Sequence, residues 1–301
     1  MADLESRIAR LKLLEPHLRA NILGQDHVIA RVAEALVRAE MGLAPKGRPK
    51  GSFLFVGPTG TGKTELALCF TEFLFGPGHV QRFDLSEYQN QTSVEKLLGV
   101  DRADPGLLGR ALSGNAAGTL LFDELEKAHP LVLDLFLQML DAARVTVATG
   151  ETISLEGHFL VFTSNVGSAE AMRMERSSWA GIEAATLRRI EQGLRPELIA
   201  RLDEKLVFKR LLPETQREIC RLLVDREVGR LRDLGHDLKV TQEAIDFLVR
   251  QGFDAERGAR PMRRAVERYL QKAVIYRLFQ SGNAAGTVAV LQATGLLQIL
   301  P

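Results

Sequence analysis

The chain has 301 residues, of which 46% are apolar and 26% charged, and its 39 basic and 38 acidic side chains leave a formal charge of +1. This composition can build a sizeable core, so a wholly disordered protein is excluded, and the length suits one large or two modest domains. Nucleic acid is not an expected partner, because phosphate binding needs an excess or a clustering of positive charge. No apolar run approaches the roughly 20 residues of a membrane helix, so we expect a cytoplasmic protein without a membrane partner.

The opening segment, residues 1–45, has the spacing of amphipathic helices. Leu4, Ile8 and Leu11 share one helix face, and Pro16 interrupts the pattern. A second amphipathic run covers residues 26–41, and Gly42 suits the C-terminal cap of a helix. We therefore expect helices that lead into the domain that follows.

Short apolar runs then alternate with helical patterns, which is typical of a parallel sheet covered by helices on both faces. The predicted strands are 53–56, 81–85, 119–122, 159–163 and 206–208. After residue 208 we expect three helices and a closing β pair, at 213–234, 244–251, 261–280, 287–291 and 296–300. The sequence thus predicts an α/β domain over residues 1–209 and a small, mainly helical domain over residues 210–301.

Directly after the first predicted strand, eight residues match the phosphate-loop pattern G-x-x-x-x-G-K-[ST]. They are Gly57, Pro58, Thr59, Gly60, Thr61, Gly62, Lys63 and Thr64. In this pattern the glycines let backbone N–H groups converge on a phosphate, and the following helix N-terminus adds positive potential. Lys63 would reach the β- and γ-phosphate oxygens, and Thr64 would ligate Mg²⁺. The alternative is a simple Gly-rich turn, but the strand before it and the helix after it favour a site for nucleotide phosphates and Mg²⁺.

An acidic pair narrows the class of nucleotide-binding protein. The predicted strand 119–122 delivers Asp123 and Glu124 to its C-terminal end. Asp123 can hold hydrated Mg²⁺ through water, and Glu124 can polarise a water molecule against the γ-phosphate. A phosphate loop alone also suits kinases, GTPases and motors, whereas a glutamate in this place favours hydrolysis of the bound nucleotide.

The order of the motifs resembles that of the AAA+ ATPases, and more closely the second ATPase domain of the Clp-type unfoldases and disaggregases such as ClpB and ClpA. The matching stretches are ILGQ at 22–25, FDLSEY at 83–88, LFDELEKAHP at 121–130, FTSN at 162–165, RPE at 195–197, RLDE at 201–204 and GARPMRR at 258–264. The resemblance extends from about residue 14 to the C-terminus. It implies a P-loop AAA+ fold, with the C-terminal domain acting as a lid.

The resemblance also implies roles for residues outside the phosphate loop. Asn165 would orient the attacking water, and Arg260 would touch the γ-phosphate of the ATP bound to its own subunit. The backbone of Ile22 and Leu23 would line the adenine pocket. Arg201 would be an arginine finger that acts on the ATP of a neighbouring subunit, which implies a ring, hexameric as in the family.

Two segments depart from the Clp pattern. The family has a pore loop of the kind Gly-Ala-Pro-Pro-Gly-Tyr-Val-Gly, but no aromatic residue occurs here between Gln89 and Leu121. We interpret this as a deletion around residues 100–104, and the alternative alignment puts Leu107 in the aromatic position. Without an aromatic side chain, the grip on an unfolded polypeptide should be weaker. The second segment, residues 144–150, replaces a polar pore loop and suits a simple hairpin.

These features predict an ATPase that remodels, unfolds or disassembles a protein substrate, which an adaptor could deliver. The alternative is a nucleotide-dependent assembly switch that threads nothing. We expect no ClpP-type peptidase as partner, because residues 168–194 contain neither Ile-Gly-Phe nor Ile-Gly-Leu. In this segment Trp179 suits an exposed loop aromatic or a partner contact. Since the length leaves no room for a substrate-binding domain or a first ATPase domain, we expect a stand-alone module.

Overall fold

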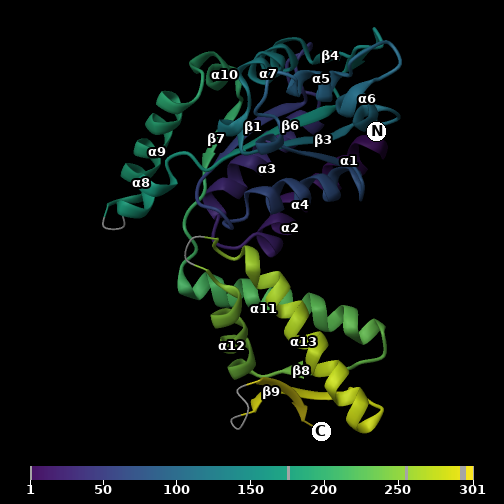
Figure 1. Ribbon diagram of the computed structural model, residues 1–301, viewed down its shortest axis with the longest axis vertical. Helices are drawn as coiled ribbons and strands as arrows, with labels where there is room; N and C mark the ends of the chain where they lie inside the picture. Colours follow the sequence, from purple (N-terminus) through teal and green to yellow (C-terminus); the bar gives the residue numbers. More distant parts are fainter. Residues whose placement is uncertain (1, 175–176, 255–256, 292–295, 301) are drawn as a thin grey trace. The chain divides into compact units, whose positions relative to one another are not determined.

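The computed structural model describes residues 2–174, 177–254, 257–291 and 296–300 (Figure 1). The chain divides into two compact units, Met1–Gly57 with Gly62–Phe208, and Pro58–Thr61 with Lys209–Pro301. Within the described residues, none of the helices combines the length and apolarity that crossing a membrane requires.

A five-stranded parallel sheet organises the first unit (Figure 1). Its spatial order is β2 (Val80–Asp84), β3 (Gly118–Asp123), β6 (His158–Ser164), β1 (Gly51–Val56) and β7 (Glu204–Val207). Every predicted strand is present and every pairing is parallel, so the predicted α/β sheet is confirmed. Two predicted strand ends are wrong, because Leu85 begins the short helix η1 (Leu85–Glu87) and Phe208 lies beyond β7.

Alternate side chains of the strands enter two separate cores. Phe53 and Phe55 pack on one face with α1 (Ala2–Lys12), α2 (Leu14–Asn21), α3 (Asp26–Glu40) and α4 (Lys63–Phe75). Leu54 and Val56 pack on the other face with α5 (Ser93–Leu98), α6 (Gly106–Leu112), α7 (Pro130–Ala142), α9 (Trp179–Gly193) and α10 (Pro196–Arg201). Because both faces are covered, the strands are apolar at successive positions rather than at alternate ones.

The N-terminal helices follow the predicted pattern with one difference. Pro16 does not end a helix, because it lies in the first turn of α2, where its missing N–H breaks no hydrogen bond. Gly42 follows α3 with a φ of 72°, the left-handed conformation that glycine adopts readily after a helix.

The segment between β6 and β7 contains two helices that were not predicted from the sequence, α8 (Ser168–Arg173) and α9. Trp179 is the first residue of α9, and the Ser178 hydroxyl caps the helix by accepting from the Gly181 N–H. The Trp179 ring is partly buried and packs edge-on against His27, with ring centroids 5.0 Å apart. The interpretation of Trp179 as an exposed loop aromatic is therefore wrong. The predicted hairpin is present as β4 (Arg144–Thr146) and β5 (Thr152–Ser154).

The second unit has its own core. Its elements are α11 (Pro213–Asp233), β8 (Leu238–Val240), α12 (Gln242–Gly252), α13 (Arg260–Ser281), β9 (Gly286–Leu291) and β10 (Leu296–Leu300). The three helices and the antiparallel β9–β10 pair lie where the sequence predicts them. Strand β8, which pairs in parallel with β9, was missed because three residues are too few to show a period.

A buried histidine makes the first unit sensitive to acid. His158, at the start of β6, is 2% exposed, and its Nδ1 has no hydrogen-bond partner among the described residues. Burial, together with the smaller effects of the nearby His79 and Lys50, lowers the pKa of His158 to about 4. The folded state therefore binds fewer protons than the unfolded state between pH 4 and pH 6.5. The resulting stability is present above pH 6.5 and is lost as the pH falls toward 4.

We expect the unfolding free energy of the wild-type chain to fall by about 3 kcal/mol relative to that of His158→Leu between pH 7 and pH 4. Urea unfolding of both proteins at each pH measures this difference, in which the contributions of shared carboxylates cancel. A difference that stays constant with pH would contradict the assignment of a neutral, buried His158.

Candidate functional site

The loop between β1 and α4 depends on two glycine conformations. Gly57 has a φ of 142°, and a Cβ atom there would lie 2.8 Å from the carbonyl oxygen of Phe208. Gly62 has a φ of 102° and immediately precedes α4. The Thr61 hydroxyl donates to the Pro58 carbonyl at 2.8 Å. The loop thus ends at a helix N-terminus, where the first N–H groups have no partner inside the helix and can face an anion.

Lys63 lies at the centre of this loop and is only 8% exposed. Its Nζ donates to the carbonyl oxygen of Gly57 at 2.5 Å and to Oδ1 of Asn165 at 2.9 Å. Burial lowers the pKa of Lys63 to about 8, and three carboxylates oppose this effect, those of Glu126, Asp123 and Glu124. With this pKa the amine is mostly protonated at neutral pH, as phosphate binding requires.

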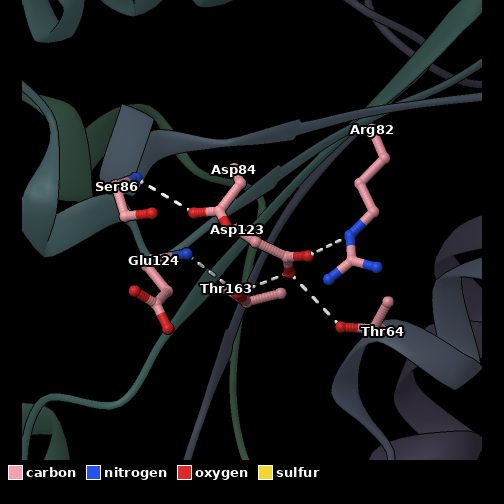
Figure 2. Close-up of polar contacts among 7 residues, drawn as sticks. All are labelled: Thr64, Arg82, Asp84, Ser86, Asp123, Glu124 and Thr163. Atoms are coloured by element: carbon pink, nitrogen blue, oxygen red, sulfur yellow. Dashed lines mark hydrogen bonds and ion pairs between the residues drawn. The ribbon is translucent and has the colours of Figure 1, made fainter. Parts of the chain in front are cut away.

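Asp123, the last residue of β3, connects several elements (Figure 2). Its Oδ1 accepts from Thr163 Oγ1 at 2.8 Å and from Thr64 Oγ1 at 3.3 Å. Its Oδ2 accepts from Arg82 Nε at 2.5 Å. Strands β2, β3 and β6 and the first turn of α4 therefore meet at one carboxylate, whose side chain is 8% exposed.

Glu124 has a backbone conformation that is rare outside glycine, with φ 61° and ψ 54°. Its N–H donates to Thr163 Oγ1 at 3.2 Å, and the helix η2 (Leu125–Lys127) follows. A left-handed conformation costs a non-glycine residue about 1–3 kcal/mol, and such residues cluster at functional sites. This bend ends the strand directly after Asp123, so the carboxylates of Asp123 and Glu124 lie at the same end of the strand.

Asn165 follows β6 and bonds to two charged side chains. Its side-chain oxygen accepts from Lys63, and its backbone N–H donates to Oε1 of Glu126 at 3.1 Å. Glu126 is a site residue for which no role was predicted from the sequence. The second oxygen of this carboxylate is buried and has no hydrogen-bond partner among the described residues. The structure thus brings Lys63, Asp123, Glu124 and Asn165 close together.

One of the two predicted adenine-lining residues, Ile22, lies beside the loop. Ile22 is buried just after α2, and a Cβ atom built on Gly62 would lie 3.6 Å from Cγ2 of Ile22. Leu23 is partly buried. Thr64 and Asp123 offer a hydroxyl and a carboxylate oxygen, which are the hard donors that Mg²⁺ prefers, so these residues fit the predicted metal.

The two predicted arginines lie on other elements. Arg201 is the last residue of α10, and its Nε is 2.6 Å from Oδ2 of Asp141 on α7. Its Nη1 also donates to the Glu197 carbonyl at 2.8 Å. Arg260 is the first residue of α13 and belongs to the second unit.

One site residue, Arg82, gives no local signal in the sequence. It lies on β2, where Arg82 pairs in register with Leu121 and Asp84 with Asp123. No motif marks Arg82 as a partner of Asp123, because their contact depends on the pairing of β2 with β3. The FDLSEY stretch that begins at Phe83 was the only available signal that this region lies near the site.

A parallel sheet with a phosphate loop after β1 and an acidic pair after β3 defines a P-loop nucleotide-binding fold. Residues 48–205 match the family model of the AAA domain (Cdc48 subfamily), and residues 211–290 match that of the C-terminal, D2-small domain, of ClpB protein. The chain belongs to the Clp/Hsp100 family of AAA+ ATPases, with a D2-type ATPase domain. The predicted family and fold class are confirmed.

Known relatives agree along nearly the whole chain. Chaperone protein ClpB 2 of Nostoc sp. is 37% identical over 294 residues, which cover 93% of this chain and 33% of that protein. The chloroplastic chaperone protein ClpC3 of Oryza sativa is 35% identical over 304 residues, covering 95% of this chain and 33% of that protein. The chain thus spans about a third of the length of these relatives.

Solved structures share the fold. The closed-state cryo-EM reconstruction of Hsp104 with ATPγS and FITC casein has a TM-score of 0.86 and 32% identity, covering 99% of this chain and 53% of that one. The Hsp104–ADP complex of S. cerevisiae has a TM-score of 0.88 and 31% identity, covering 98% of this chain and 53% of that one.

Proposed function

We propose that this chain forms a hexameric ring and hydrolyses ATP at the interfaces between its subunits. The energy of hydrolysis is used to remodel, unfold or disassemble a protein partner. The observation that carries this proposal is the convergence of Lys63, Asp123, Glu124 and Asn165 at one end of the sheet. This set contains a phosphate-binding cation, an acid for the metal and a candidate general base.

Each residue has a separate role in the proposed reaction. Lys63 binds the β- and γ-phosphates, Glu124 polarises the attacking water, and Asn165 orients that water. When bound, Mg²⁺ neutralises charge on the phosphates, and Thr64 together with Asp123, the latter through water, would hold it. Arg260 of the same subunit contacts the γ-phosphate. Arg201 of a neighbouring subunit stabilises the charge that develops during transfer.

The relatives support a protein as the partner. ClpB 2 and ClpC3 are named chaperones, and one Hsp104 structure was determined with casein. We therefore propose that this chain acts on a protein substrate or receives one from an adaptor protein. We expect neither a ClpP-type peptidase nor nucleic acid as a partner, and we place the protein in the cytoplasm. Residues 210–301 would act as a lid on the ATPase domain of residues 1–209.

A second candidate, the assembly switch that threads nothing, is favoured by the turn between α5 and α6. The Asp104 carboxylate closes this turn by accepting from the Gly106 N–H at 3.0 Å and from Arg110 Nη1 at 2.8 Å. These contacts lower the pKa of Asp104, and the hydrogen bond from the Gly106 N–H has the largest effect. Leu107 lies on helix α6 rather than in a loop, which favours the deletion over the alternative alignment.

The β4–β5 hairpin is joined to this turn. The Ala148 N–H donates to the Leu98 carbonyl at 2.8 Å, and Val147 is buried against Gly109. The two segments that would face a pore therefore form one compact surface without an aromatic side chain. Threading predicts that an unfolded polypeptide stimulates ATP hydrolysis, whereas the switch predicts no stimulation.

Replacing Glu124 with glutamine is expected to preserve ATP binding and slow hydrolysis by about 10²- to 10⁴-fold, because the general base is lost. The ring should then stay in its ATP state and retain its protein partner. A pulldown with Glu124→Gln in ATP, analysed by mass spectrometry, checks this against the same protein in ADP. Unchanged hydrolysis would refute the role of Glu124, and a ring without any ATP-dependent protein partner would refute remodelling.

A further inference from the structure

Arg82 occupies one side of the carboxylate that is assigned to Mg²⁺. We propose that Arg82 is a built-in counter-ion of Asp123 that competes with Mg²⁺, so that metal loading requires the guanidinium to move away. This inference rests on the proposed function, because it adds a regulatory residue to the same nucleotide site.

The hydrogen bonds around Asp123 show that its carboxylate already has partners on both oxygen atoms (Figure 2). Thr163 and Thr64 engage Oδ1, and Arg82 engages Oδ2, so both carboxylate oxygens have donors. A nearly buried carboxylate is costly unless an opposite charge lies nearby. Arg82 supplies such a charge through an ion pair of 2.5 Å, in addition to the nearby Lys63 ammonium.

Arg82 can leave this position more easily than Asp123 can. The side chain of Arg82 is 49% exposed, whereas that of Asp123 is 8% exposed. The guanidinium therefore keeps contact with water throughout a rotation away from the carboxylate. Thr64 can keep its hydrogen bond to Asp123, 3.3 Å away, because the hydroxyl hydrogen makes that bond and an oxygen lone pair remains for the metal.

The neighbouring acid on β2 does not hold Arg82 back. Arg82 and Asp84 lie two residues apart and so share one face of the strand. Asp84 Oδ1 accepts from the Ser86 N–H at 3.0 Å, which caps η1, and Figure 2 shows it turned toward Ser86. The same strand thus carries one acid with a local structural role and one base directed at the metal-binding carboxylate.

Electrostatics gives the sign of the competition. A single positive charge and a doubly charged metal beside one carboxylate repel each other, and the repulsion is reduced but not removed at a partly exposed position. Removing the charge of Arg82 should therefore favour the metal-bound state, and keeping the charge with lysine should not.

Binding of ADP at increasing Mg²⁺ concentrations, measured by isothermal titration calorimetry, tests the proposal. The Mg²⁺ concentration for half-maximal tight binding should fall about three- to tenfold in Arg82→Gln. It should stay within about twofold of wild type in Arg82→Lys, which keeps the charge. Arg31→Gln is the matched control, because Arg31 is 48% exposed and pairs with Glu204 at 2.7 Å, and it should behave as wild type.

An unchanged or higher Mg²⁺ requirement in Arg82→Gln would overturn the proposal, since Arg82 would then only orient Asp123. If Arg82→Gln increased the affinity for ADP equally in EDTA and in Mg²⁺, the proposal would also be overturned, because the charge of Arg82 would then act on the nucleotide rather than on the metal. If the wild-type chain bound no nucleotide, the proposed function would fail together with this inference. Mg²⁺-dependent binding that Arg82→Gln leaves unaltered would refute this inference alone.

Discussion

Replacing Lys63 with methionine is expected to weaken ATP binding about 100-fold, which corresponds to the loss of about 2.7 kcal/mol from charge-assisted hydrogen bonds to phosphate. Lys63 is only 8% exposed in the folded chain. Methionine retains most of this buried volume and removes only the ammonium group. Equilibrium binding of a fluorescent ATP analogue measures the effect.

The control for this variant is Lys205→Met. Lys205 is partly buried on β7, and its Nζ lies 3.5 Å from the Ile199 carbonyl, so it matches Lys63 in type and approximate environment. Lys205→Met should bind ATP as wild type does. Urea unfolding should show that Lys63→Met is folded, because it removes a buried charge without leaving a large cavity. Tight ATP binding by a folded Lys63→Met would refute the phosphate-site assignment.

Arg201→Ala is expected to leave ATP binding intact and to reduce hydrolysis about 10³-fold, the lower limit for removal of an arginine finger. The physical reason is that a finger stabilises charge that appears only during phosphoryl transfer. Turnover and ATP affinity must be measured at protein concentrations at which the subunits assemble.

Arg195→Ala is a closely matched control for this variant. Arg195 immediately precedes α10 and pairs with Asp134 on α7, as Arg201 at the other end of α10 pairs with Asp141. The two arginine side chains are 36% and 33% exposed, respectively. Arg195→Ala should therefore reproduce the loss of an α7–α10 ion pair and leave hydrolysis within a few-fold of wild type.

Mixing two inactive variants tests whether the finger acts between subunits. Arg201→Ala subunits retain Glu124, and Glu124→Gln subunits retain Arg201, so a mixed ring contains some interfaces with both groups. ATP hydrolysis should reappear on mixing. If the mixture stays inactive although the subunits co-assemble, or if Arg201→Ala alone retains full turnover, the action in trans is refuted.

Several elements of the fold could be predicted because they depend on neighbouring residues. The strands 53–56 and 159–163 read as continuous apolar runs, and such runs are buried on both faces of a parallel sheet. The segment around Trp179 was harder, since α9 buries only Thr186 and Ile190 and so has a weak apolar pattern. Its contact with His27 joins parts of the chain about 150 residues apart, and no local pattern reports such a pairing.

The candidate site likewise combines motifs that are visible in the sequence with contacts that only the folded chain creates. Residues 57–64 and the pair Asp123–Glu124 could be recognised from the amino-acid sequence, because each group acts through consecutive residues whose spacing is visible. The contacts of Asp123 with Arg82, Thr64 and Thr163 could not, because they span 41, 59 and 40 positions. They exist because strands β2, β3 and β6 are neighbours in the sheet and α4 begins beside them. The sequence alone therefore determined the motifs that predict phosphate binding and hydrolysis. The folded sheet decided that Asp123 pairs with Arg82, since only the neighbouring position of β2 and β3 brings the two side chains together.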